Sequence, residues 1–278
     1  MTKLGPDLVV VHILPPENNQ SMPDSWNRRI DRATALARGD SRASALLTQY
    51  AAILAAQRTC YDALVADGDR LTGSLDRDLP DVRLCAAGAF STVREFLPAG
   101  IASDAPGGDP AIDELLRDGW YAPSAPFLAR LVLQPYAEAL SRLGRCPEGR
   151  NIGATPGRAT CPFCGGPPQV SVLRRDSGSD GGGRELICAL CSTNWALRRI
   201  LCVHCGEEDE HRLKYFHTPE FDHVRVDACE TCLRYLKAVD LSRLGIAVPV
   251  VDEVASGALD IWAHEHGFIK VEVNLVGL

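Results

Sequence analysis

Four C-x-x-C pairs dominate the second half of this 278-residue sequence: Cys161/Cys164, Cys188/Cys191, Cys202/Cys205 and Cys229/Cys232. Each cysteine of the first two pairs recurs 41 positions later in the last two. The spacing C-x2-C-x23-C-x2-C therefore occurs twice, and a fixed period of this length indicates a duplicated structural unit. The repeat limits the possible folds more than any other feature, because both copies must fold so that their four cysteines are buried in the same way.

The repeated pairs predict metal binding. Two residues between cysteines let the chain turn tightly enough to aim both sulfurs at one point, and two such pairs complete a tetrahedron of thiolates. That ligand set suits zinc or a rubredoxin-type iron. We therefore predict two metal ions, zinc or iron, each with four cysteine ligands drawn from the eight cysteines above. Disulfides are the alternative, but they require an oxidising compartment, and the apolar patch near the N-terminus is too short for an export signal.

The spacing does not decide which pairs share an ion. In a sequential arrangement, Cys161/Cys164 joins Cys188/Cys191, and Cys202/Cys205 joins Cys229/Cys232. In a cross-braced arrangement, the first pair joins the third and the second joins the fourth. The 23-residue interval inside each repeat is long enough for a hairpin, which favours the sequential arrangement. Gly165 and Gly206 follow the second cysteine of their pairs, where we expect a positive φ.

Apolar residues recur every three or four positions through the first half, which predicts helices. We expect helices over 26–37, 41–66, 82–97 with Leu84 facing inward, a short one from Asp109, and 126–143 with a kink at Pro135. Within the repeats we expect strands over 169–173, 184–188, 211–216 and 224–228, and short helices over 193–200 and 230–241. A helix over 253–266, capped by Asp252, and a strand over 268–275 complete the expected elements.

The predicted fold class is α+β, with an all-helical N-terminal domain and two tandem rubredoxin-like or zinc-ribbon modules followed by a C-terminal helix and strand. The expected divisions are a helical domain over 1–145, a linker over 146–160, modules over 161–200 and 201–245, and a segment over 246–278 that packs on the modules. Outside the repeats we expect Cys60, Cys85 and Cys146 to be separate buried or half-buried thiols, and His223 to be exposed.

Charge and hydropathy limit the partners. The formal net charge is −7, and it becomes more negative if eight thiolates bind two divalent ions. Such a chain is a poor generic ligand for a phosphate backbone, so we expect no nucleic acid partner. No apolar run approaches the ~20 residues of a membrane span, and we expect a cytoplasmic protein without membrane insertion.

The residues around the cysteines resemble one family. The segments Cys161-Pro162-x-Cys164-Gly165, Arg184-x-Leu186-x-Cys188-x-x-Cys191-x-Thr193-x-Trp195 and Cys229-x-x-Cys232-x-x-Tyr235-Leu236-Lys237 are similar to the formate dehydrogenase accessory protein family, FdhE. So are Val251-Asp252-Glu253-Val254-Ala255-Ser256, Arg32-Ala33 and Leu133-Gln134-Pro135-Tyr136. One departure is Glu253, where the family more often has Asp.

The resemblance implies a chaperone-like maturation factor rather than an enzyme. It implies binding to the catalytic subunit of formate dehydrogenase before export, in support of assembly of the active enzyme. The eight cysteines carry over as ligands, and no catalytic residue does. A rubredoxin-like protein that passes one electron through Fe(Cys)4 centres is the alternative, and a zinc-ribbon nucleic-acid module is a less favoured one. Whether the chain forms a homodimer stays open.

Overall fold

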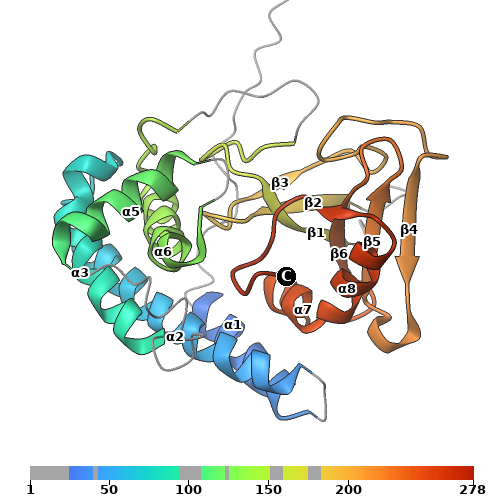
Figure 1. Cartoon of the computed structure of the whole chain (residues 1–278), viewed down its shortest axis with the longest axis horizontal. Coiled ribbons are helices and arrows are strands. Elements are labelled where there is room, and N and C mark those ends of the chain that lie inside the picture. Colours follow the sequence, from blue (N-terminus) through green and yellow to red (C-terminus); the bar gives the residue numbers. More distant parts are fainter. Residues whose placement is uncertain (1–24, 40–42, 94–107, 123–124, 151–158, 175–182) are drawn as a thin grey trace, which may run out of the picture.

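The structure is a computed structural model that describes residues 25–39, 43–93, 108–122, 125–150, 159–174 and 183–278. Helices occupy the first half of the chain, and strands begin only in the cysteine repeats (Figure 1). The predicted class, helical domain followed by mixed α and β structure, is confirmed. The start of the helix expected at 41, the end of the one expected at 97 and most of the linker lie outside the described residues.

The helical half is built around one buried helix. Its described helices are α1 (Ser25–Ala37), α2 (Ser44–Ala66), α3 (Leu75–Val93), α5 (Asp109–Tyr121) and α6 (Phe127–Leu143). Twelve of the 17 residues of α6 are buried, all round its circumference. A helix that is covered on every side belongs to the interior of a domain. Accordingly, α2, α3 and α5 all pack against α6, with Pro135 inside it.

One helix of this half differs from the prediction. Helix α3 begins at Leu75, seven residues before the expected start, and Pro80 lies within its first two turns. Its buried stripe includes Val82, Ala86 and Val93. Leu84 lies off this stripe and is 77% exposed, so the expectation that it faces inward was wrong.

The strands of both cysteine repeats form one sheet in the order β3-β2-β1-β6-β5-β4. The first repeat contributes β1 (Pro168–Arg174), β2 (Gly183–Cys188) and β3 (Asn194–Ala196); the second contributes β4 (Leu213–His217), β5 (Val224–Cys229) and β6 (Arg234–Asp240). The repeats join where β1 and β6 pair in parallel, with Ser171 opposite Ala238. Because of this pairing, the two copies share a hydrogen-bonded sheet.

The helices expected after the second cysteine pair of each repeat were wrong. Strands β3 and β6 occupy these positions, pairing with β2 and with β5 in antiparallel ladders. Strand β6 also lies next to β1, so it is central, and five of its seven residues are buried. By local propensity, the segment Tyr235-Leu236-Lys237 can form a helix or a strand. The extended form is more stable here because β1 and β5 offer a hydrogen-bonding edge on each side of it.

Two short helices cover one face of the sheet near its C-terminal strands (Figure 1). They are α7 (Pro249–Ala255) and α8 (Gly257–Glu265), in place of the single helix expected over 253–266. Asp252 lies inside α7, where its carboxylate accepts the Val248 N–H at 2.7 Å. The expected strand over 268–275 is reduced to β7 (Ile269–Lys270), which pairs with β6.

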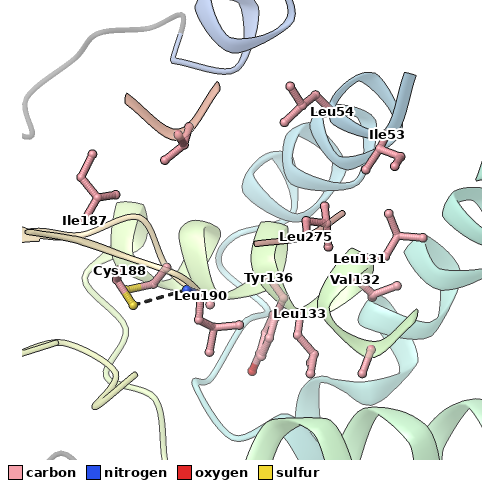
Figure 2. Close-up of a cluster of buried hydrophobic side chains, with 14 of the residues drawn as sticks. Ile53, Leu54, Leu131, Val132, Leu133, Tyr136, Ile187, Cys188, Leu190 and Leu275 are labelled. Atoms are coloured by element: carbon pink, nitrogen blue, oxygen red, sulfur yellow. Dashed lines mark hydrogen bonds between the residues drawn. The ribbon is translucent and has the colours of Figure 1, made fainter. Parts of the chain in front are cut away.

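Helix α6 connects the helical half to the first cysteine module. Figure 2 shows Leu131, Leu133 and Tyr136 of α6 in the same apolar cluster as Ile187 and Leu190 of the module. On the same helix, the Gln134 side-chain amide donates to the Ala189 carbonyl at 2.8 Å. The apolar core therefore continues from the helices to the cysteines, and the first module cannot unfold without exposing part of the helical core.

Candidate metal centres

The first repeat brings four sulfurs into one cluster. Cys161 and Cys164 come from the turn before β1, whereas Cys188 is the last residue of β2 and Cys191 lies in the turn that follows it. The Sγ atoms of Cys161 and Cys191 are 3.5 Å apart, and those of Cys164 and Cys188 are 3.4 Å apart. All four sulfurs lie within 4.8 Å of one another.

The second repeat builds the same cluster 41 residues further along the chain. Cys202 Sγ is 3.7 Å from Cys232 Sγ, and Cys205 Sγ is 3.8 Å from Cys229 Sγ. These four sulfurs also lie within 4.8 Å of one another. The pairs are thus grouped sequentially, each repeat around its own centre, and the cross-braced alternative does not describe this fold.

These distances fit a metal ion better than a disulfide. A zinc ion with Zn–S bonds of ~2.3 Å places its sulfurs ~3.8 Å apart along the edges of the tetrahedron. A disulfide would require ~2.05 Å. The observed separations of 3.4–3.8 Å match the tetrahedron. Each cluster could therefore hold one metal ion, and four thiolates suit zinc and iron alike.

The backbone takes the same path at all four pairs. The residue after each second cysteine has a positive φ: 71° at Gly165, 54° at Ser192, 77° at Gly206 and 54° at Leu233. This conformation lets its N–H return to the carbonyl of the first cysteine, as from Gly206 to Cys202 at 3.1 Å. The expectation for the two glycines is confirmed. Ser192 and Leu233 were missed because such residues seldom adopt this region, and only the repeat itself could have indicated them.

Backbone N–H groups also face the sulfurs. The Leu190 N–H donates to Cys188 Sγ at 3.4 Å (Figure 2), and the His204 N–H donates to Cys202 Sγ at 3.4 Å. Such bonds stabilise thiolates in a cluster. Gly166 leaves room for the first cluster, since a Cβ there would lie 3.2 Å from Cys188 Sγ.

The two centres differ in their burial. All four cysteines of the first are buried, whereas Cys205 of the second is exposed and Cys232 is half-buried. Helix α6 covers the first centre: Ser192 donates to the Glu138 carboxylate at 2.6 Å, and Ser141 lies 3.3 Å from the Thr193 hydroxyl. The second centre is therefore more accessible to solvent than the first.

Burial also affects ionisation in the first cluster. Hydrogen bonds from the neighbouring thiols lower the pKa of Cys161, whereas burial raises the pKa of Cys188 and Cys191 well above the usual value. Four thiolates that are buried away from water need a cation to balance their negative charge. A bound ion would supply that balance, and it would thereby contribute to the stability of the fold.

A buried charge cluster joins β6 to α7 and α8. Glu253 of α7 is fully buried and accepts hydrogen bonds from Lys270 and from Asn274, the latter at 3.0 Å. Lys237 of β6, also fully buried, lies 3.1 Å from Glu253 and 2.5 Å from Asp260 of α8. Two ammonium groups thus face two carboxylates. Sequence reasoning marked Glu253 and Lys237 only as parts of separate motifs.

A second polar contact joins the first helix to the sheet layer. Arg32 of α1 binds both carboxylate oxygens of Asp252, at 3.0 and 2.5 Å, and His223 Nε2 lies 3.0 Å from the same carboxylate. Burial raises the pKa of Asp252, but these partners outweigh it and lower the pKa. His223 was expected to be exposed, and this was wrong, because α7 brings Asp252 over it.

The three cysteines outside the repeats differ in burial. Cys60 is buried, Cys85 is half-buried with its Sγ 3.6 Å from the Cys60 carbonyl, and Cys146 is exposed. The expectation of a buried or half-buried thiol was therefore wrong for Cys146.

Among the described residues, no helix combines the length and apolarity that a membrane span requires.

Comparison with protein families identifies both cysteine modules. Residues 160–199 match the model of the FdhE central domain, and residues 200–276 match that of the FdhE C-terminal domain. A protein named as an FdhE homolog from Aquifex aeolicus is 43% identical over 117 residues, which span 42% of this chain and 41% of that protein. Another FdhE homolog, from Pseudomonas aeruginosa, is 29% identical over 95% of this chain and 93% of its own length.

A solved structure shares the fold. The crystal structure of the FdhE protein from Pseudomonas aeruginosa matches with a TM-score of 0.61 and 23% identity, covering 92% of this chain and 97% of that one. The chain is therefore similar to FdhE in fold over most of its length, and the cysteine modules also match the FdhE domain models.

Proposed function

Since this chain belongs to the FdhE family, we propose that it is an accessory protein of formate dehydrogenase that binds the catalytic subunit in the cytoplasm. It supports assembly of the active enzyme before export, and it acts by binding rather than by catalysis. The observation that carries the proposal is the match of both four-cysteine modules, over residues 160–276, to FdhE domains. Similarity along almost the whole Pseudomonas aeruginosa relative supports extending it to the helical half.

The eight cysteines would hold two metal ions, zinc or iron, one in each repeat. Small ribbons have little core of their own, so each ion would contribute folding free energy, typically ~10–16 kcal/mol for structural zinc in small peptides. The chain supplies the turns, the backbone N–H donors and the cover from α6 that hold the sulfurs in place. In this proposal the centres stabilise a surface that the client recognises.

The test is binding between purified components. The tagged chain is mixed with the formate dehydrogenase catalytic subunit of the same host, and separately with an unrelated exported redox enzyme of similar size. We expect retention of the formate dehydrogenase subunit alone. In a host strain that lacks the gene, formate dehydrogenase activity should fall and return when the gene is restored. Equal retention of both proteins, together with undiminished activity in the deletion strain, would contradict the proposal.

One observation favours a second candidate function. Cys205 is exposed at the second centre, and an iron ion held by four cysteines near the surface can exchange one electron with a partner. Metal analysis and visible absorption of protein isolated from its own host, without added zinc, separate the two candidates. A red iron protein with a reversible one-electron couple supports electron transfer, and a colourless zinc protein eliminates it.

A further inference from the structure

A cavity of about 400 Å³ lies on the sheet between the two modules, next to the second centre. Its lining includes Arg184 of β2, Tyr215 of β4, Asp227 of β5 and Leu236 of β6, closed on one side by the 199–203 segment that links the modules. Lys237, the neighbour of Leu236, reaches the other way to Asp260 of α8. The cavity therefore opens on the sheet face that α7 and α8 leave uncovered.

The cavity is cationic in a chain that is acidic overall. Five cationic side chains line it against two carboxylates, and the cations are Arg184, Arg199, Lys214, Arg225 and Arg234. The second centre, if it holds a divalent ion on four thiolates, keeps two negative charges next to this cavity and offsets only part of the surplus. Because the net charge of the whole chain is −7, an anionic group is attracted to this cavity more than to the rest of the surface.

Part of this charge holds the cavity in shape. The Arg184 side chain is 6% exposed; it donates to the Ser171 hydroxyl at 3.0 Å and to the Leu201 carbonyl at 3.0 Å. These bonds fix the 199–203 segment against the sheet. Arg184 also shares one carboxylate, that of Asp227, with Arg225, whose Nε donates to it at 2.7 Å.

Arg199, Lys214 and part of the Arg225 guanidinium are available to a ligand. Arg199 and Lys214 are exposed, and within the part of the chain that the structure describes neither forms an ion pair. Arg225 is 28% exposed, and its guanidinium lies 5.1 Å from the centre of the Tyr215 ring. An exposed tyrosine beside an arginine with spare N–H donors is a surface suited to a carboxylate next to an apolar group.

Strand β4 adds a means of binding an extended chain. It is the last strand of the sheet, at the right of Figure 1, and among the described strands only β5 pairs with it. Its outer edge therefore offers backbone N–H and C=O groups beside the cationic cavity. A peptide that hydrogen-bonds along this edge can place acidic side chains over Arg199 and Arg225, whereas a small anion would leave the edge unused.

We propose that this cavity and the adjoining edge of β4 bind a carboxylate-rich, extended segment of a protein partner. The inference rests on the proposed function and deepens it, because it names the surface that would hold an acidic segment of the formate dehydrogenase catalytic subunit. Guanidinium–carboxylate pairs provide the recognition, and the acidic remainder of the chain repels the same segment elsewhere.

The test uses the full metal-loaded chain and calorimetric titration with a hexaglutamate peptide. Hexaglutamine and a six-residue oligothymidylate serve as comparison ligands. We expect binding of hexaglutamate that weakens as salt rises, and no binding of hexaglutamine. Arg199→Gln should weaken the binding two- to fivefold, and Arg199→Gln with Arg225→Gln at least tenfold. The matched control is Arg198→Gln, since Arg198 is also exposed but pairs with Glu208 outside the cavity; it should leave binding within twofold.

Three results with the peptides and the oligothymidylate would overturn the inference. They are equal binding of hexaglutamine, equal loss from Arg198→Gln and Arg199→Gln, and tighter binding of the oligothymidylate, which would indicate phosphate recognition instead. Retention of the catalytic subunit separates this inference from the proposed function. If the double variant loses hexaglutamate but retains the subunit, the cavity is not the client site. If the unaltered chain binds hexaglutamate but not the subunit, the proposed function fails and the cavity remains.

Discussion

Replacing Glu253 by Gln should destabilise the protein by about 3 kcal/mol while leaving its shape unchanged. The Glu253 carboxylate is fully buried and faces Lys237 and Lys270, which also share Asp260. Two buried positive charges are therefore balanced by two negative ones. Glutamine keeps the volume and a carbonyl oxygen, but it leaves one buried ammonium without a counter-charge, which is costly in a dry interior.

The magnitude follows from the ionisation of Glu253. Burial alone raises the pKa of this carboxyl, but the two ammonium groups outweigh burial and lower the pKa from 4.5 to about 2. At ~1.36 kcal/mol per pKa unit, the folded state gains about 3 kcal/mol from the ionised form. Because the pKa is lowered on folding, this stabilisation is complete above pH ~4.5 and is lost as the pH falls toward 2. Measurement at pH 7 therefore records all of it.

Thermal unfolding of the metal-loaded protein, followed by circular dichroism, measures the effect. With an unfolding entropy of ~2.1 cal/mol/K per residue, a loss of 3 kcal/mol lowers the Tm of a chain of this size by about 5 °C if it unfolds as one unit. Glu265→Gln is the matched control, since it makes the same change on an exposed residue of the adjoining helix. It should change the free energy of unfolding by less than ~0.5 kcal/mol.

A double variant gives the decisive comparison. Lys270→Met alone leaves an unbalanced carboxylate, and Glu253→Gln alone leaves an unbalanced ammonium, but together they restore one cation to one anion. We expect the double variant to be more stable than the sum of the single losses predicts, by at least ~1 kcal/mol. Strict additivity, or a Glu253→Gln loss no larger than that of Glu265→Gln, would refute the charge-balance reasoning.

Three further predictions concern the centres and the core. A chelator should remove one ion per chain quickly and the other slowly, because Cys205 is exposed and the first centre is covered by α6; a colorimetric chelator records both phases, and Cys202→Ser should abolish the fast one. Leu131→Ala should cost 2–5 kcal/mol and Leu84→Ala less than ~0.5 kcal/mol, because Leu131 is fully buried and Leu84 is 77% exposed; urea unfolding distinguishes them. Leu233→Gly should leave the free energy of unfolding unchanged or raise it by up to ~1 kcal/mol, because the φ of 54° at Leu233 strains any residue with a Cβ. A lower Tm would contradict this.

The local patterns that were predicted correctly are those with a single physical cause. The helices of the first half follow from apolar residues that recur every three or four positions, and the sulfur clusters from paired cysteines within hairpin reach of each other. The positive φ at Gly165 and Gly206 follows from the absence of a Cβ. The helical periodicity and the glycine turns act within a few residues of their effect, whereas the grouping of the cysteine pairs also needed the fold, because it joins sulfurs 24 to 30 residues apart.

Most of the incorrect predictions have a different cause. The segments around Trp195 and Lys237 suit a helix or a strand equally by local composition, and they became β3 and β6 because β2, β5 and β1 offered free edges. His223 was misplaced because its partner Asp252 comes from α7, whereas Leu84 was misplaced because it lies off the buried stripe of α3.

The sequence by itself determined that this chain has a helical half and a duplicated module with two sets of four cysteines, because helix periodicity acts over a few residues and the C-x-x-C pairs recur at a fixed interval. Only the tertiary structure decided that the two modules share one sheet, that the first centre is covered while the second reaches the surface, and that Glu253 meets Lys237 and Lys270. Strand pairing, burial and charge balance all depend on residues that are distant in sequence, and their energies exist only once the chain has brought those residues together.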